Sequence, residues 1–589
     1  MTGIREYLKQ GRPLLFDGAM GTYFSTLPGR ESERCEQANV DHPEEILEIH
    51  RAYLKAGCRA IKTNTFSVGS DVALGQKAYA AKLVRAASRL AKEAAAPYEA
   101  YVFADLGPAP QGSEVSPADV YCQQADLFLE QGITHFLVET LATDAGIGEF
   151  ARYLKSHCPE AFLIVSFAVA TDGITREGFS GEELLRRTAA LTEVDAVGFN
   201  CVSGPHHLLN YIRSMDLTGI TLSVMPNAGY PTVLGRRMVF GGKPDYFGQK
   251  MLQIAQAGVA ILGGCCGTTP EHIKQVAAEL AQNSETKTII VQPLEQEPRG
   301  VRGRNSLEEK LDSGQRIIAV ELDPPVDDDA NAFLAGVKAL RDAGADIVTI
   351  ADCPIGRPRA DSSLLACKIK RELGMDVLPH MTCRDRNLNA TKALLLGLSM
   401  EGVHNVLVVT GDPIPTENRD EVKSVYNFNS RKLARYVSSL NETVLHTPFR
   451  IFGALNVNAK NFETQLKIAQ EKEACGVTGF LTQPVLSREA LENLKLARSS
   501  LKGTILGGIF PVVSYRNACF LNNEISGMRV CDEIVSLYEG KDREAAEELA
   551  IKISVQVAEK VVPYTDGLYL MTPFHRTELM TRILERLEK

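Results

Sequence analysis

The stretch DHPEEILEIHRAYLKAGCRAIKTNTF, residues 41–66, joins a helical pattern to a short apolar run. Four apolar side chains share one face of the predicted helix: Ile46, Ile49, Tyr53 and Leu54. Asp41 is placed to cap the start of this helix, and Gly57 is placed to end it. The run that follows, AIKTNTF at 60–66, has the length and apolar character of a buried strand. The stretch therefore predicts a helix packed beside a strand.

The same alternation of strand and helix recurs along the whole chain. The first part has eight apolar runs, at 14–19, 60–66, 101–108, 136–141, 162–167, 196–201, 221–227 and 260–266. The second part has eight more, at 316–325, 346–352, 376–383, 405–412, 450–457, 479–485, 504–512 and 567–574. Near-continuous apolar runs separated by helices indicate parallel strands covered on both faces, and eight of them per half fit a (β/α)8 barrel better than an open sheet. The predicted fold is α/β: two tandem (β/α)8 TIM barrels joined by a linker.

The domain boundaries follow from where this rhythm stops. Residues 284–306 are rich in Glu, Gln, Pro and Arg and show no periodicity, which is typical of a linker. We therefore expect one barrel over 1–283 and a second over 307–589. The helical pattern DANAFLAGVKALRDAG at 329–344, after the first strand of the second half, again runs from an Asp cap to a Gly stop.

Composition excludes several classes of protein. The chain of 589 residues carries 64 Lys and Arg against 73 Asp and Glu, a net charge of −9, which argues against a nucleic-acid or anionic-membrane binder. No run is long enough to cross a bilayer, so a soluble, cytoplasmic protein is expected. The thirteen cysteines are scattered without a CxxC spacing, which argues against a disulfide framework, a zinc ribbon and a thioredoxin-type pair.

In barrels of this kind the chemistry lies at the C-terminal ends of the strands. Seven polar residues end the runs of the first half: Asp17, Thr65, Glu139, Cys201, Asn227, Cys265 and Cys266. Three thiolates form a soft ligand set that suits Zn²⁺ and leaves a fourth position open, as in catalytic zinc sites. The competing interpretation is that Cys201 is a lone buried thiol and that GGCCG is a tight turn.

Four motifs at these strand ends resemble those of zinc-dependent homocysteine S-methyltransferases: DGAMGT (17–22), TNTF (63–66), GFNC (198–201) and GGCCG (263–267). The resemblance implies that Cys201, Cys265 and Cys266 bind zinc and that homocysteine enters as a fourth, sulfur ligand. It also implies a set of homocysteine-binding residues: Asp17, Gly18, Thr65 and Glu139. Of these, Asp17 and Glu139 would hold the amino group. Asn227 is similar to a residue that can occupy the open zinc position transiently, before substrate binds.

One position departs from this family pattern. Lys62 stands where relatives often have Glu before TNTF, and the sequence predicts no role for it.

The second half also has polar strand ends: Glu321, Thr349, His380, Asp412 and Gln483. Lys472 lies on a helix that precedes one of these strands. The chain has no P-loop, and its weak GxGxxA match at 146–151 does not directly follow a strand, so a nucleotide cofactor would have to be held in another way. Taken alone, these residues indicate an enzyme-like barrel and no more.

Five motifs of the second half resemble 5,10-methylenetetrahydrofolate reductase: VELDPP (320–325), PHMTC (379–383), VTGDP (409–413), LTQPV (481–485) and GIFPV (508–512). The resemblance implies an FAD site that includes Thr349, His380, Asp412 and Lys472. It further implies Glu321 as the general acid, Gln483 on the pterin, and Arg576 on folate or nucleotide. Asp412 could in addition stabilise the cationic intermediate, and NAD(P)H would supply the hydride.

The whole chain therefore resembles a bifunctional fusion of the two enzymes. One half would reduce 5,10-methylenetetrahydrofolate to 5-methyltetrahydrofolate, and the other would methylate homocysteine to methionine. The methyl donor stays open between methyltetrahydrofolate itself, a sulfonium such as S-methylmethionine, and a separate corrinoid protein. The main alternative is a zinc methyltransferase with a sulfonium donor whose second barrel only binds a ligand or regulates. A pair of barrels without retained chemistry is a further alternative, and a homo-oligomer is an expectation from the family.

Overall fold

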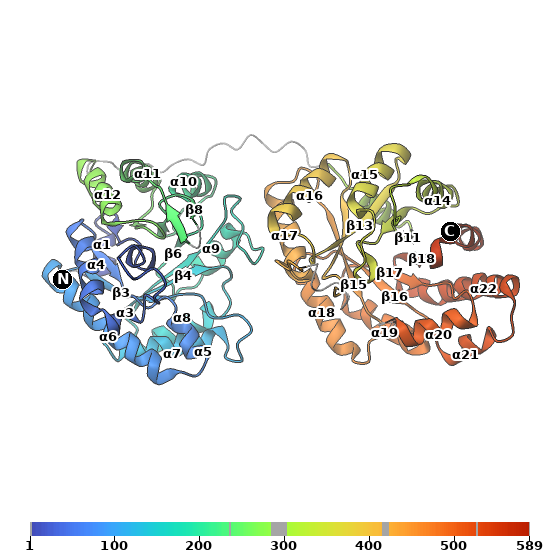
Figure 1. Cartoon of the computed structure of the whole chain (residues 1–589), viewed down its shortest axis with the longest axis horizontal. Helices are drawn as coiled ribbons and strands as arrows, with labels where there is room; N and C mark the ends of the chain where they lie inside the picture. Colours follow the sequence, from blue (N-terminus) through green and yellow to red (C-terminus); the bar gives the residue numbers. More distant parts are fainter. Residues whose placement is uncertain (1–2, 235–236, 284–302, 415–422, 526–527, 588–589) are drawn as a thin grey trace. The chain divides into compact units, whose positions relative to one another are not determined.

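The computed structural model describes residues 3–234, 237–283, 303–414, 423–525 and 528–587 (Figure 1). Contacts between residues divide the chain into two units, Met1–Pro298 and Arg299–Lys589. Most of the predicted linker, residues 284–302, lies outside the described residues.

The first unit is a ring of eight parallel strands: β1 (Leu14–Leu15), β2 (Ala60–Lys62), β3 (Tyr101–Leu106), β4 (His135–Leu141), β5 (Phe162–Phe167), β6 (Ala196–Asn200), β7 (Leu222–Met225) and β10 (Ile261–Leu262). The strand order is β1-β10-β7-β6-β5-β4-β3-β2. A parallel bridge between Phe16 and Ala60 brings β1 beside β2 and so nearly closes the ring. The eight predicted strands of this half are therefore confirmed.

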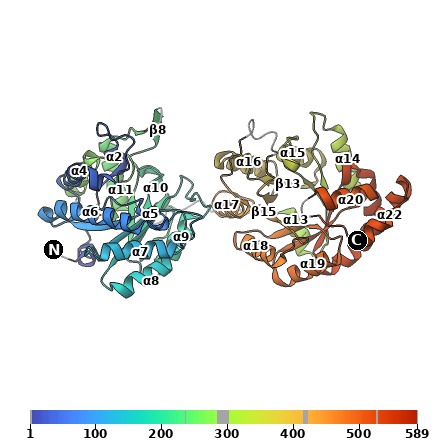
Figure 2. The same ribbon diagram turned by 60° about the horizontal axis from the view of Figure 1, so that its bottom comes forward.

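Helices surround this ring on the outside (Figures 1 and 2): α1 (Ile4–Leu8), α2 (Gly21–Phe24), α3 (Ala38–Asp41), α4 (Pro43–Lys55), α5 (Val68–Ala73), α6 (Lys77–Ala95), α7 (Pro117–Leu129), α8 (Ile147–His157), α9 (Gly181–Ala189), α10 (Pro205–Arg213), α11 (Pro244–Gln256) and α12 (Pro270–Gln282). A short antiparallel hairpin, β8 (Pro231–Leu234) and β9 (Arg237–Phe240), follows β7 and was not predicted.

Helix α4 confirms one part of the sequence prediction and corrects another. The four predicted face residues are all buried, and Gly57 adopts φ +105°, which ends the helix. Asp41 does not cap it, because that residue is the last of α3 and the helix begins after His42 with Pro43 in its first turn. Proline is favoured there because its missing N–H is one that no helical carbonyl would accept.

The second unit is a closed barrel of eight parallel strands: β11 (Ile317–Leu322), β12 (Ile347–Ile350), β13 (Asp376–Thr382), β14 (Asn405–Val409), β15 (Arg450–Leu455), β16 (Gly479–Pro484), β17 (Thr504–Ile509) and β18 (Gly567–Met571). All eight predicted strands are present and adjacent in chain order. The prediction of two tandem barrels is therefore confirmed.

Helices also surround the second ring: α13 (Ser306–Asp312), α14 (Asn331–Asp342), α15 (Ser362–Leu373), α16 (Leu388–Met400), α17 (Ser430–Thr443), α18 (Phe462–Ala474), α19 (Arg488–Ser500), α20 (Tyr515–Glu524), α21 (Asp532–Leu537), α22 (Arg543–Val561) and α23 (Thr577–Arg586). At the start of α14, the Asp329 side chain accepts a hydrogen bond from the Asn331 N–H (2.9 Å), and Gly344 adopts φ +106° beyond its end.

Each barrel has its own apolar interior. In the first it consists of Leu14, Phe16, Ala60, Tyr101, Phe103, Leu137, Phe162, Ile164, Ala196, Met225 and Ile261. In the second it consists of Ile317, Ala319, Ile347, Leu378, Leu407, Phe452, Leu481, Leu506, Tyr569 and Met571. Burial of one such large side chain contributes about 1.5–3 kcal/mol, so these layers fix the strands on which the polar ends stand.

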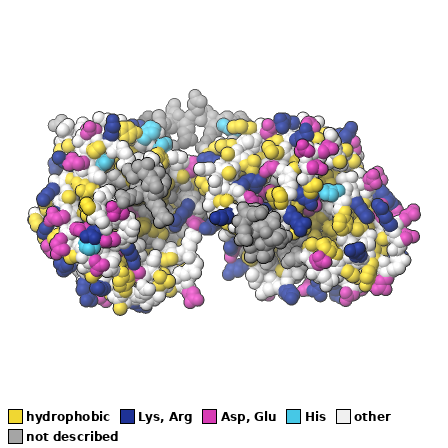
Figure 3. All heavy atoms as spheres, viewed as in Figure 1, with side chains coloured by type: hydrophobic (Ala, Val, Ile, Leu, Met, Phe, Trp, Pro, Cys, Tyr) yellow, Lys and Arg dark blue, Asp and Glu magenta, His cyan; other side chains and the backbone are white. Residues whose placement is uncertain are grey.

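The described surface and helices show two further features. On the face drawn in Figure 3, basic and acidic side chains are mixed over both units. No described helix combines the length and the hydropathy that a bilayer span requires.

Candidate active sites

The interior of the first barrel changes from apolar to polar toward the C-terminal ends of its strands. Because side chains alternate along a strand, the residue two positions after an inward apolar residue also points inward. On β2, β3 and β4 these next residues are Lys62, Asp105 and Glu139, and on β6 Asn200 points inward four positions after Ala196. All four are buried, so the barrel ends in a layer of polar side chains beneath the loops.

The three predicted thiols lie together above this layer. The Sγ atoms of Cys201, Cys265 and Cys266 all lie within 4.8 Å of one another, and Cys201 Sγ is 3.7 Å from Cys266 Sγ. Two backbone hydrogen bonds position them: the Cys201 N–H donates to the Met225 carbonyl (3.1 Å), and the Cys265 N–H donates to the Pro226 carbonyl (2.8 Å). The loops after β6, β7 and β10 are thus tied into one wall.

The backbone at this wall is strained. Cys201 and Val202 adopt φ +58° and +55°, a left-handed conformation that residues other than glycine seldom take. Such strain is typical of functional sites, where the surrounding structure holds a residue in an unfavourable conformation. The strained residue Cys201 is thus one of the three whose sulfur atoms converge.

The donor set fits a soft metal ion. Three convergent thiols are the ligands that Zn²⁺ prefers, and all thirteen cysteines of the chain are free of disulfides. Asn227 lies beside them, since its N–H donates to the Ser203 carbonyl (3.1 Å), and its buried Oδ1 has no hydrogen-bond partner in the described structure. Hydrogen bonds from Cys265 and Cys266 lower the pKa of Cys201 to about 3, so this cluster already favours one thiolate.

Two predicted carboxylates lie in the polar layer. Asp17 Oδ2 accepts a hydrogen bond from the Lys62 N–H (3.0 Å), while its Oδ1 is buried without a partner in the described structure. Glu139 Oε2 accepts from Asn200 Nδ2 (3.0 Å), which also lies 3.8 Å from Cys265 Sγ. Asn200 therefore links Glu139 to the thiol of Cys265. Burial raises the pKa of Asp17 to about 7 and also raises that of Glu139.

Sequence analysis missed three members of this layer: Asn200, Asp105 and Lys62. Asp105 is the next-to-last residue of β3, and burial followed by the nearby Glu139 raises its pKa well above the usual range. Lys62 lies with its Nζ 3.6 Å from Glu139 Oε1. Burial lowers the pKa of Lys62, but Glu139 and Asp17 outweigh this effect and raise it well above the usual value. Their positions at or next to the C-terminal ends of β2, β3 and β6 were the signal that could have identified all three.

Gly18 and Thr65 are two of the predicted homocysteine-binding residues. Both are closely packed beside the layer of buried polar side chains. A Cβ atom on Gly18 would lie 2.6 Å from Thr268 Oγ1 and 2.8 Å from Tyr53 Cε1, so the backbone passes there without room for a side chain. The Thr65 hydroxyl donates to the Asp105 carbonyl (2.8 Å), and it therefore holds β3 in place.

In the second barrel, Glu321 and His380 meet a tyrosine that was not predicted. The Tyr569 hydroxyl donates a hydrogen bond to Glu321 Oε2, and His380 Nε2 lies 3.7 Å from the same oxygen. Burial raises the pKa of Glu321 to about 7, although the Tyr569 hydrogen bond opposes this effect. Burial lowers the pKa of His380 to about 4, so the imidazole is neutral at pH 7. Inward alternation along GLYLM (567–571) could have identified Tyr569.

Thr349 belongs to the same group, because it pairs with Glu321 in the register of β11 and β12. Its hydroxyl is buried and has no hydrogen-bond partner in the described structure. Asp412, by contrast, is exposed, and its Oδ2 accepts from the Ile355 N–H (2.9 Å). It therefore connects the loops after β12 and β14.

The remaining predicted residues of the second barrel form no hydrogen bond or ion pair with Glu321 or His380 in the described structure. Lys472 Nζ donates to the Ala454 carbonyl (2.8 Å), and burial followed by the nearby Arg431 lowers its pKa to about 8. The Gln483 carbonyl accepts from the Thr482 hydroxyl (2.9 Å). Arg576 precedes α23.

A buried ion-pair cluster that was not predicted supports the loops at this mouth. Asp352 Oδ2 accepts from Thr382 Oγ1 (2.9 Å) and from Arg386 Nη1 (2.7 Å). Arg384 Nη1 donates to the Asp412 carbonyl (2.9 Å). These bonds fix the segment after β13 against its neighbours.

The residues at this mouth fit a flavin. Thr349 offers a buried hydroxyl without a hydrogen-bond partner in the described structure, which suits the polar edge of such a cofactor. Three apolar side chains in the loops after β11, β12 and β18 are exposed: Val326, Ile355 and Phe574. Apolar side chains beside polar groups are typical of cofactor sites.

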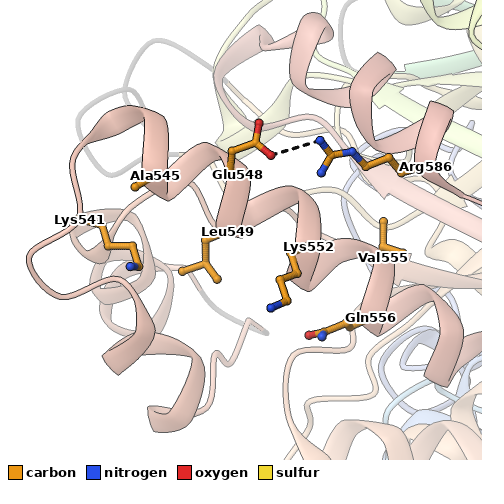
Figure 4. Close-up of a pocket in the computed structure, with 8 residues that line it drawn as sticks. All are labelled: Lys541, Ala545, Glu548, Leu549, Lys552, Val555, Gln556 and Arg586. Carbon is orange, nitrogen blue, oxygen red and sulfur yellow. Dashed lines mark hydrogen bonds and ion pairs between the residues drawn. The ribbon is translucent and has the colours of Figure 1, made fainter.

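The described residues of the second unit line at least two cavities. One, of about 610 Å³, lies between α22 and α23 on the outside of the barrel, where Glu548 pairs with Arg586 at 3.2 Å (Figure 4). It contains no strand-end residue, and no role is assigned to it. The other, of about 1440 Å³, is lined in part by Asn456 and Val485, which follow β15 and β16.

Comparison with known proteins gives the family of each half. Residues 14–280 match the family Homocysteine S-methyltransferase, and residues 306–588 match the family Methylenetetrahydrofolate reductase. Methionine synthase from Mycobacterium leprae (strain TN) is 31% identical over 308 residues, which are 48% of this chain and 25% of that protein. Methionine synthase from Mycobacterium tuberculosis (strain ATCC 25618 / H37Rv) is 32% identical over 313 residues, with the same coverage of both chains. The chain thus spans about a quarter of the length of these curated relatives.

Among solved structures, the metallated form of the homocysteine methyltransferase MmuM from Escherichia coli has 23% identity and a TM-score of 0.38, covering 47% of this chain and 99% of that one. Its apo form has 24% identity and a TM-score of 0.36 with the same coverage. The two family matches, and not these structures, assign a homocysteine S-methyltransferase domain to residues 14–280 and a methylenetetrahydrofolate reductase domain to residues 306–588.

Proposed function

We propose that the chain is a bifunctional enzyme of methionine and one-carbon metabolism. Its first barrel would transfer a methyl group to homocysteine and give methionine, and its second would reduce 5,10-methylenetetrahydrofolate to 5-methyltetrahydrofolate with NAD(P)H. The observation that carries this proposal is the convergence of three Sγ atoms within 4.8 Å of one another, directly above buried carboxylates. A soft metal site beside anions suits a substrate with both a thiol and an ammonium group.

In the first barrel, Cys201, Cys265 and Cys266 would hold Zn²⁺, and the unpaired Asn227 Oδ1 would be available for the fourth position until substrate arrives. Zinc, when bound, keeps a coordinated thiol deprotonated at neutral pH and so supplies a thiolate nucleophile. Asp17 and Glu139 would accept hydrogen bonds from the substrate ammonium.

The buried environment of these two carboxylates favours the binding of a cation. Burial raises the pKa of Asp17 to about 7, which means that the protein groups around it compensate its charged form only in part. A ligand ammonium would supply the remaining compensation, and Asn200 holds Glu139 in place for it through the 3.0 Å hydrogen bond.

The methyl donor is tested by incubating the zinc-loaded chain and homocysteine with each of three donors: methyltetrahydrofolate, S-methylmethionine and a methylated corrinoid protein. Methionine should form with one of them. If no donor gave methionine while the protein held zinc and bound homocysteine, methyl transfer by the first barrel would be refuted.

In the second barrel, Thr349, His380, Asp412 and Lys472 would hold FAD, and Gln483 and Arg576 would contact the folate. FAD, when bound, carries the hydride from NAD(P)H to the folate. Glu321 holds a proton on its carboxyl group near neutral pH and would donate it to a ring nitrogen of methylenetetrahydrofolate, which opens the ring. Asp412 would stabilise the resulting cation electrostatically.

The neighbours of Glu321 suit the role of an acid. Neutral His380, whose Nε2 lies 3.7 Å away, leaves the proton on the carboxyl group because its own pKa lies near 4. The proposed reductase predicts a yellow protein whose flavin is bleached by NAD(P)H and recovers its colour with methylenetetrahydrofolate. A chain that bound flavin without this recovery would favour the alternative, a second barrel that only binds or regulates.

A cytoplasmic location is part of the proposal. It is supported by the thirteen free cysteines, because reduced thiols persist in the cytoplasm and pair in oxidising compartments. A homo-oligomer stays a prediction from the family.

A further inference from the structure

Lys62 is a buried cation that the proposed mechanism does not use. It ends β2 in the polar layer of the first barrel, and only 7% of its surface is exposed. Its Nζ lies 3.6 Å from Glu139 Oε1, which is longer than the 2.7–3.2 Å of a hydrogen bond. Within the described residues, Glu139 is the one carboxylate within 4.0 Å of Nζ, so two of the three ammonium donors have no carboxylate in reach. A buried ammonium in this state requires an acceptor.

The layer around Lys62 holds an excess of acid. Three carboxyl groups, those of Asp17, Asp105 and Glu139, are buried beside this one lysine, and burial raises the pKa of each. The carboxylates can accept an ammonium from a ligand, and the lysine can donate to an anionic oxygen of the same ligand. The layer therefore offers both signs of charge.

An α-amino acid carries its ammonium and its carboxylate on one carbon atom. A site that binds both groups needs an anion and a cation side by side, as Glu139 and Lys62 are at 3.6 Å. If Lys62 served only to neutralise Glu139, we would expect direct hydrogen bonds between them, since a buried pair without good geometry does not repay its loss of hydration.

We propose that Lys62 binds the α-carboxylate of the amino-acid substrate of the first barrel. Lys62 thereby selects homocysteine against thiols that lack a carboxylate. This inference rests on the proposed function of that barrel, and it assigns a specificity-determining role to Lys62.

The test compares homocysteine with 3-amino-1-propanethiol, which has the same thiol and amine but no carboxylate. Both are titrated calorimetrically into the zinc-loaded full-length chain and into the variants Lys62→Gln and Lys62→Arg. The wild type should bind homocysteine more tightly by about 10- to 100-fold, the worth of a charge-assisted hydrogen bond. Lys62→Gln should reduce this preference to within about threefold by weakening homocysteine binding alone, and Lys62→Arg should largely retain it.

Three results would overturn the proposal. The first is equal binding of both thiols by the wild type. This result is obtained without any variant, so misfolding of a variant cannot explain it. The second is a change of the affinities for both thiols by the same factor in Lys62→Gln. Lys62 would then only neutralise the neighbouring carboxylates. The third is that neither thiol binds the zinc-loaded wild type. This result would also refute the proposed function of the first barrel.

Controls separate these results from misfolding. Lys55→Gln, at an exposed position of α4, should leave both affinities unchanged. The circular dichroism and the zinc content of each variant should equal those of the wild type.

Discussion

Replacement of Glu321 by glutamine tests the proposed acid without changing its shape. The amide oxygen of the introduced glutamine can still accept the Tyr569 hydroxyl, but the side chain has no acidic proton to give. We therefore expect Glu321→Gln to leave the reduction of the flavin by NAD(P)H nearly intact and to slow its reoxidation by methylenetetrahydrofolate.

The size of the effect follows from the environment of the carboxyl group. Burial raises the pKa of Glu321 to about 7. At pH 7 about half of the molecules would then carry the proton, against about 0.2% for a glutamic acid with an ordinary pKa near ~4.3. Loss of a general acid slows a reaction by about 10²–10⁴-fold, so we expect a decrease in this range for the folate step.

The pH dependence has a definite sign. The protonated form of Glu321 is the active one, so the wild-type folate step should be fastest below pH 7 and should fall about tenfold per pH unit above it. The Glu321→Gln variant should lose this dependence. Flavin reduction by NAD(P)H needs no proton from Glu321 and should show no such decrease in either protein.

Stopped-flow absorbance of the flavin measures the two half-reactions separately. Glu544→Gln, at an exposed position in the first turn of α22, serves as the matched control and should behave as the wild type does. Equal slowing of both half-reactions in Glu321→Gln, or a wild-type folate step that does not fall above pH 7, would refute the assignment.

Two further predictions concern side chains next to the sites. Tyr569→Phe removes a hydrogen bond that lowers the pKa of Glu321, so the alkaline decrease of the folate step should move to higher pH by roughly one unit; a movement to lower pH would contradict the role of this bond. Gly18→Ala places a Cβ atom 2.6 Å from Thr268 Oγ1 and should destabilise the first unit by about 1–3 kcal/mol in urea unfolding followed by circular dichroism. The control Gly3→Ala, where a Cβ atom meets nothing within 4 Å, should change little, and equal stability of the two variants would refute the packing argument.

Much of the fold could be predicted because each barrel strand is buried on both faces and so appears in the sequence as an apolar run. The hairpin β8–β9 was not predicted because it lies outside the ring of strands. Its stretch PTVLGRRMVF (231–240) also lacks the Asn-Gly or Asp-Gly pair that indicates a two-residue turn. Asp41 was a reasonable cap by residue type, but α3 continues through it.

The residues of the two candidate active sites could be predicted only in part. The cysteines could be placed together because all three follow strand ends, and strand ends meet at one mouth of a barrel. Lys62, Asp105 and Tyr569 were not assigned roles, because a charged or polar residue at a strand end has a function only through its neighbours on other strands. The 3.6 Å separation of Lys62 and Glu139 and the hydrogen bond from Tyr569 to Glu321 join residues 77 and 248 positions apart.

The coordination of the metal in the first barrel is the central claim, and zinc K-edge X-ray absorption measures it directly. We expect one zinc per chain with three sulfur ligands at ~2.3 Å and one lighter ligand, and four sulfur ligands after homocysteine is added. A zinc that already has four sulfur ligands without homocysteine, or a sulfur count that stays at three when homocysteine is bound, would contradict it.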